Sequence, residues 1–178
     1  MTYPSFTTGE VLTASDMNAV GLWKIAETTF SAQTTIAIDN CFSSNYAHYL
    51  ITYNLTTNIS GQYTGLRLRA SGTAKSANYD RSALYTTTSG VTGVDGYGTG
   101  QSEWYLAGQS TTLLVGHAYL YNPNVSARTG FTGSAAYPGA YLACGSQTES
   151  YVADGFQVAA AGNAATYTGT IRVYGIRN

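Results

Sequence analysis

The feature of this sequence that most constrains its fold is a series of short apolar or alternating runs separated by turn residues. Successive side chains of a β-strand point to opposite faces, so runs of this kind predict strands. About ten such runs at regular spacing predict an all-β sandwich or barrel. We assign the strands to residues 22–30, 34–42, 46–57, 63–71, 82–88, 102–108, 112–122, 140–147, 154–161 and 167–177.

The alternation also predicts which side chains share a face. One apolar face is formed by Ala47, Tyr49, Ile51, Tyr53 and Leu55, opposite His48, Thr52 and Asn54, and another by Leu66, Leu68 and Ala70, opposite Arg67 and Arg69. The last run is apolar on both faces, with Ile171 and Val173 on one side and Tyr174 and Ile176 on the other. Such a strand is expected at the centre of a sheet, or where another subunit covers it.

Two stretches interrupt the pattern. Residues 86–101 carry glycine at positions 90, 93, 96, 98 and 100, and residues 122–138 lie between the turn signals Asn122-Pro123 and Pro138-Gly139. Glycine weakens a strand interior, and Asn-Pro and Pro-Gly pairs are typical of turns. We therefore predict two long loops, which in compact domains are usually functional or mobile.

The charge content excludes some classes of partner. Charged residues make up 10% of the chain, with 8 Lys and Arg against 9 Asp and Glu, so the net charge is near zero. A balance of this kind offers no basic surface for nucleic acid or for an anionic membrane. There is neither an apolar run long enough to span a bilayer nor a basic and apolar signal sequence, so we expect a soluble product of the cytoplasm.

Residues 1–21 differ from the rest and are predicted to form an attachment arm, followed by a β-domain over residues 22–178. Pro4 and Gly9 indicate an extended start, and Thr13 is a helix cap before a short helix over residues 14–20 that Gly21 ends. So short a helix needs a surface to lie against. Its apolar anchors would be Phe6, Val11, Leu12 and Met17, docking either on this domain or on another protein.

Motifs for catalysis, metals or cofactors are lacking, so we predict a non-enzymatic chain with no cofactor. The two histidines, His48 and His117, stand alone within strand patterns, without HExxH spacing or a GxSxG motif. The acidic residues are scattered and form no calcium loop. Cys41 and Cys144 are too few for a disulfide scaffold and are expected to be buried free thiols, although the sequence leaves open whether they are close enough to pair.

Aromatic residues beside the predicted loops are the remaining candidate for binding. A tyrosine or tryptophan ring offers a rigid apolar face and a polar group, which suits sugar stacking as well as packing in a core or an interface. The candidates for contact with a receptor or glycan are Tyr97, Trp104, Tyr105 and Tyr137.

Both ends of the chain resemble a family of bacteriophage virion proteins, the small tail-fibre and head-decoration proteins of tailed phages. The opening FTTGEVLTASDMNA, residues 6–19, is similar to the phrase with which these proteins begin, and a strand follows near Trp23. The closing TGTIRVYGIR, residues 168–177, resembles the last strand of their jelly-roll tip. No heptads or repeats that would form a fibre shaft separate the arm from the domain.

The resemblance implies a jelly-roll-like β-sandwich, a homotrimer and a place on the virion surface. Its partners would be other phage virion proteins, reached through the arm, and, for a tail fibre, a host surface polysaccharide. The function expected first is a tail fibre for host adsorption; the alternative is a capsid decoration protein. A polysaccharide depolymerase is a remote third hypothesis; cleavage of a glycan would require two of the scattered carboxylates to lie close together in the fold.

Overall fold

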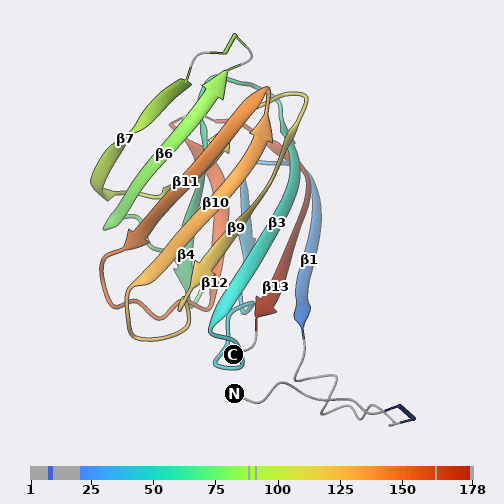
Figure 1. Ribbon diagram of the computed structural model, residues 1–178, viewed down its shortest axis with the longest axis vertical. Coiled ribbons are helices and arrows are strands. Elements are labelled where there is room, and N and C mark those ends of the chain that lie inside the picture. Colours follow the sequence, from blue (N-terminus) through green and yellow to red (C-terminus); the bar gives the residue numbers. More distant parts are fainter. Residues whose placement is uncertain (1–7, 10–20, 88, 91, 163, 177–178) are drawn as a thin grey trace.

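The computed structural model describes residues 8–9, 21–87, 89–90, 92–162 and 164–176, and every regular element within these ranges is a β-strand. Thirteen strands form two antiparallel sheets, one of eight strands and one of five (Figure 1). The predicted all-β class is confirmed, and two facing sheets are consistent with a sandwich. The predicted helix and the arm residues Phe6, Val11, Leu12 and Met17 lie outside the described residues.

The larger sheet, called the large sheet below, faces the viewer in Figure 1, with β7 at the left and β1 at the right. Its strands, in spatial order, are β1 (Leu22–Gln33), β13 (Tyr167–Ile176), β3 (His48–Thr57), β9 (Leu114–Tyr121), β10 (Thr129–Tyr137), β11 (Gly139–Gln147), β6 (Tyr79–Thr87) and β7 (Thr92–Gln101).

The small sheet lies behind it, where β4 and β12 are visible in Figure 1. It consists of β2 (Thr35–Ile38), β12 (Gly155–Ala161), β4 (Tyr63–Ala70) and β5 (Thr73–Ala74), with β8 (Trp104–Gly108) also paired to β4.

The chain passes directly between the sheets at both edges of the large sheet. Strand β1 ends at Gln33 and β2 begins at Thr35, while β7 ends at Gln101 and β8 begins at Trp104. The first corner contains a register shift between Phe30 and Gln33, and Ala32 has a φ of 52°. Irregularities of this kind bend a strand and let it change sheets.

The predicted faces agree with the core. Tyr49, Ile51, Tyr53 and Leu55 of β3 are all buried between the sheets, as are Leu66 and Leu68 of β4. Strand β13 lies between β1 and β3, with Ile171 and Val173 fully buried, which agrees with the first of the two placements predicted for it; cover of its outer face by another subunit stays a prediction.

Both predicted long loops are wrong, because each contains a strand of the large sheet. Residues 92–101 form the edge strand β7, and residues 129–137 form β10 between β9 and β11. In β7 the missing side chain of Gly93 leaves room for a ring, since a Cβ there would lie 2.4 Å from Cζ of Tyr85. In β10 only Phe131 and Ala135 carry apolar groups into the core, so the run lacks the bulk that identifies a strand in the sequence.

Candidate functional site

Trp104 is a core residue, and its predicted role in receptor contact is wrong. Its side chain is fully buried, stacked on Phe131 with a centroid distance of 5.0 Å and edge-on to Tyr79 at 4.9 Å. Its Nε1 donates a hydrogen bond of 3.2 Å to the backbone oxygen of Asp80. Trp104 therefore anchors β8 against the large sheet, and no ring face is left for a ligand.

Tyr105 and Tyr137 belong to one tyrosine cluster, formed with Tyr63 and Tyr141. The Tyr105 ring stacks on Tyr63 at 4.4 Å, Tyr63 lies 6.2 Å from Tyr141, and Tyr141 lies 6.5 Å from Tyr137. The guanidinium of Arg81 lies 3.5 Å from the centroid of the Tyr105 ring. All but the fully buried Tyr141 are half-buried, and the predicted glycan contact of Tyr105 and Tyr137 stays a prediction. The Tyr97 side chain lies outside the described residues.

The histidines and cysteines form no reactive group among the described residues. His117 lies 3.4 Å from Oγ of Ser134, and His48 packs edge-on against Tyr121. In the described part of the chain, no cluster of three or more His, Cys, Asp or Glu side chains is arranged to hold a metal ion. Both cysteines are free; Cys41 is buried, as expected, whereas Cys144 is exposed. Burial raises the pKa of the Cys41 thiol to about 12.

A buried carboxylate holds the corner between β7 and β8. Glu103 is 5% exposed, and its Oε2 lies 2.6 Å from a guanidinium nitrogen of Arg67 on β4. Its Oε1 accepts a hydrogen bond of 3.0 Å from Ser102. Gly65 leaves the space that this side chain occupies, since a Cβ there would lie 2.9 Å from Cγ of Glu103. The geometry indicates a structural role for Glu103.

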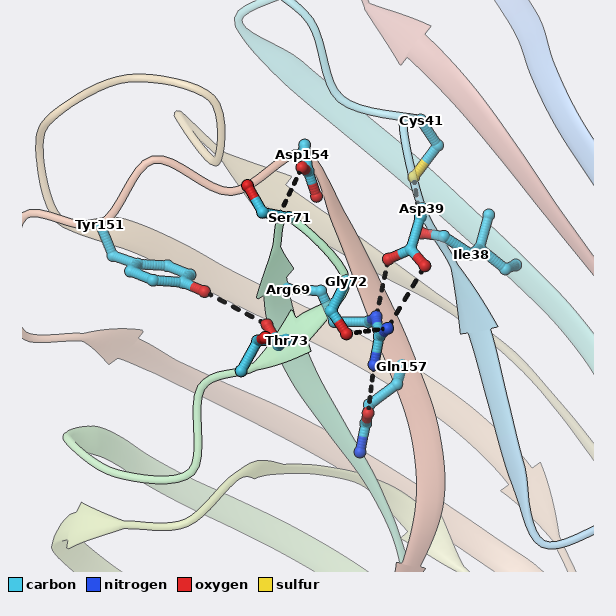
Figure 2. Close-up of polar contacts among 10 residues, drawn as sticks. All are labelled: Ile38, Asp39, Cys41, Arg69, Ser71, Gly72, Thr73, Tyr151, Asp154 and Gln157. Carbon is cyan, nitrogen blue, oxygen red and sulfur yellow. Dashed lines mark hydrogen bonds and ion pairs between the residues drawn. The ribbon is translucent and has the colours of Figure 1, made fainter.

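A second polar cluster, the Arg69 clasp, ties the edge strand β2 to the rest of the small sheet (Figure 2). Arg69 of β4 donates to both carboxylate oxygens of Asp39, at 2.7 and 3.3 Å, to Gln157 of β12 at 2.9 Å, and to the backbone oxygen of Gly72. The fork of the guanidinium matches the carboxylate, a geometry that holds two elements in one orientation. These contacts connect strands and leave the guanidinium with partners on three sides.

The outer face of the large sheet carries a feature that the sequence analysis missed. Over four neighbouring strands, apart from Asp80 at one end of β6, the described outward side chains are uncharged and mostly small or aliphatic. This uncharged strip consists of Thr132, Ser134 and Ala136 of β10, Ala140, Leu142 and Cys144 of β11, Ser82, Leu84 and Thr86 of β6, and Val94 of β7. Ser134, Leu142, Leu84 and Val94 pair side by side in its middle row.

The aliphatic residues of this row are strongly exposed. Leu84 is 52% exposed, Leu142 57% and Val94 67%. Leu84 and Leu142 are cross-strand partners and line two shallow hollows together, of about 210 and 240 Å³. Contiguous apolar surface of this kind marks an interaction site far more often than single exposed residues do.

The other described charges on the same face gather at the opposite edge of the sheet. The middle row continues through His117, Thr52 and Arg172 to Glu27 on β1. Lys24 and Arg172 both pair with Glu27, and these two contacts hold the pKa of its carboxyl below the usual value. The outer face is thus divided into a charged edge and an uncharged strip.

One signal in the sequence could have located the strip. In residues 140–147 the outward positions Ala140, Leu142 and Cys144 are as apolar as the inward Tyr141 and Ala143. The same reasoning that placed the doubly apolar last strand applies to this run.

Comparisons with known protein families, with curated proteins and with solved structures find no match for this chain. Among the described residues there is no helix with the length and apolar character needed to cross a membrane.

Proposed function

We propose that this chain is a non-enzymatic structural protein of a bacteriophage virion, a trimeric tail-fibre appendage for host adsorption. In this proposal residues 1–20 attach the protein to the particle, and the β-domain projects from it. The observation that carries the proposal is the order in which the strands pair. The opening and closing motifs, which resemble those of phage virion proteins, support the same conclusion.

The pairing order supports a jelly roll. Among the eight strands β1, β2, β3, β4, β8, β9, β12 and β13, the first pairs with the last, the second with the seventh, the third with the sixth, and the fourth with the fifth. These are the pairs of one long antiparallel hairpin rolled into two sheets. Strands β5, β6 and β7, and then β10 and β11, are insertions that widen the roll.

This architecture fits a surface module of a virus particle. Viral capsid domains and lectins are among the proteins built as jelly rolls, so the fold suits both assembly and the binding of surface sugars. The tyrosine cluster, with Tyr105 and Tyr137, is the surface that we propose for a host polysaccharide, because half-buried rings next to a guanidinium are suited to sugars.

Deleting residues 1–20 tests the attachment. The truncated protein should keep the far-ultraviolet circular dichroism and the thermal transition of the full chain, but fail to enter particles when it is the only copy supplied. Full-length protein supplied in the same way is the control. Normal incorporation of the truncated protein would show that the arm does not attach the domain.

Immunogold electron microscopy of intact particles tests the location. We expect gold at the tail. Label distributed over the capsid would replace the tail-fibre assignment by capsid decoration, and virions that carry no label would overturn the structural role altogether.

A further inference from the structure

We propose that the uncharged strip is the surface through which copies of this chain bind one another. This inference deepens the trimer of the proposed function and rests on the self-association that it contains. The partner to which it commits is a second copy of this chain. Four properties of the strip favour this contact: its exposure, its shape, its lack of charge and its area.

The shape of the strip is complementary to itself. Leu84 and Leu142 form a ridge, and because both residues line both hollows, a hollow lies on each side of it. A surface that carries a ridge beside a hollow can place its own ridge in the hollow of an identical surface. Such a contact can be repeated around a symmetry axis, as closed homo-oligomers require.

The chemistry of the strip fits an identical chain better than a charged or sugar partner. Its described members offer no cation for a phosphate or an acidic sugar and no carboxylate for a basic peptide, and the one carboxylate described at its end, Asp80, accepts a hydrogen bond from the backbone nitrogen of Gly100. Tyr141 beside it is directed into the core, and the Tyr85 ring lies against Gly93. With a net charge of -1, two copies repel each other weakly, so burial of aliphatic surface decides the contact.

The area is sufficient for a stable contact. In the same rows β9 and β3 add the half-buried Val115, Tyr119 and Leu50. The four strands of the strip, about 4.8 Å apart, and three rows about 7 Å apart give about 400 Å² on each copy. The same rows on β9 and β3, which also contain His117, Thr52 and Asn54, bring this to about 600 Å², or about 1,200 Å² in total, which exceeds the roughly 1,000 Å² expected of a specific interface.

The inserted strands supply this surface. All members of the strip lie on β10, β11, β6 and β7, which widen the large sheet beyond the eight paired strands of the proposed roll. The strands that are added to the roll are therefore the same strands that carry its exposed leucines.

The experiment replaces the ridge by charge and follows both mass and thiol exposure. The variant is Leu84→Lys with Leu142→Lys, because burying two ammonium groups opposes the contact. The matched control is Val125→Lys with Val152→Lys, which changes two residues that are 44% and 48% exposed and lie outside the strip. Analytical ultracentrifugation gives the mass, and a maleimide gives the labelling rates of the thiols.

Cys144 reports on the strip, and Cys41 reports on folding. Cys144 is exposed in the single chain and belongs to the strip, whereas Cys41 is buried. In the assembled wild-type protein and in the control, Cys144 should react at least about tenfold more slowly than in the monomeric ridge variant, because reactivity follows exposure. Protection of Cys41 in all three proteins shows that each is folded.

Every outcome decides the proposal. A folded, monomeric ridge variant with fast Cys144 labelling, beside an assembled control, supports it. A monomeric wild-type protein at micromolar concentration overturns it, as does a ridge variant that assembles with Cys144 still protected. A dimer with a protected strip would keep this inference and remove the proposed trimer, so the two can fail separately.

Discussion

At the scale of single residues, two glycines of the central strands differ in what surrounds them. A Cβ on Gly116 of β9 would lie 2.4 Å from the backbone oxygen of Ser134 and 2.5 Å from the hydroxyl of Tyr53. A Cβ on Gly130 of β10 would meet the Tyr121 side chain at 3.4 Å or more, an ordinary contact. The first glycine makes room for a buried tyrosine, and the second does not.

We therefore expect Gly116→Ala to destabilise the domain by about 2 kcal/mol or more, because the neighbouring strand and the Tyr53 ring must both move. Gly130→Ala is the control and should change the free energy of unfolding by less than about 1 kcal/mol in either direction. Urea denaturation of the three proteins gives the comparison. Equal stabilities of the two variants would contradict the close packing of Tyr53 on Gly116.

At the scale of elements, the Arg69 clasp explains how a strand as short as β2 stays at the edge of the small sheet. Strand β2 spans only Thr35–Ile38 and pairs with β12 alone. Asp39 follows it directly and receives two hydrogen bonds from Arg69, whose side chain is 12% exposed. The clasp thus adds a second attachment beside the ladder.

Arg69→Met should cost about 1.5–3 kcal/mol of stability, the range for hydrogen bonds to charged groups, and hydrogen exchange should accelerate in β2. Arg172→Met is the matched control: it removes an ion pair to Glu27 from a side chain that is 41% exposed, and should cost less than about 1 kcal/mol. Equal losses in the two variants, with unchanged exchange in β2, would show that the clasp does not hold the strand.

The elements that the sequence predicted well are those with alternating bulk. Tyr49, Ile51, Tyr53 and Leu55 alternate with polar residues, and their side of β3 was assigned correctly. Strand β10 was missed because Gly130, Gly133 and Ser134 are too small to give the alternating bulk that identifies a strand. Small residues suit this position because β10 is packed between β9 and β11, which the sequence alone does not show. Small residues of this kind are favoured by contacts between neighbouring strands, and these contacts cannot be read from one stretch of sequence.

The candidate site was hard to predict for a related reason. Trp104 follows a segment that was predicted to be a loop, so its ring was predicted to lie at the surface. The corner that turns Trp104 inward depends on Glu103, which contacts Arg67 of another strand. The exposed leucines, Leu84 and Leu142, come from separate runs that pair only in the folded sheet. Both features depend on pairing across distant parts of the chain.

At the scale of the whole molecule, the two ends of the described domain are neighbours. Leu22 at the start of β1 pairs with Ile176 at the end of β13, and β13 also pairs along its length with β3. A single buried cluster extends over both sheets. A domain closed in this way is expected to unfold in one cooperative transition, so the ionisation of any buried group affects the stability of the whole.

Alkaline pH should therefore destabilise this protein as a unit. Burial raises the pKa of Cys41 from 9.0 to about 12, and burial also raises the pKa of Tyr53, Tyr79 and Tyr167. Above pH 9 the unfolded chain loses these protons while the folded chain keeps them, so the folded state binds more protons and its stability falls as the pH rises. Each such group contributes up to about 1.4 kcal/mol per pH unit between its two pKa values.

Cys41→Ala isolates the contribution of one group. Its stability at pH 8 should be lower than that of the wild-type protein, because a buried side chain becomes smaller. Between pH 9 and about 12 its loss of stability should be shallower by up to about 1.4 kcal/mol per pH unit, since the thiol no longer titrates. Urea denaturation at a series of pH values, with a reductant present, measures both slopes. Parallel slopes would mean that the Cys41 thiol ionises alike in the folded and unfolded chains, which its burial in this core does not allow.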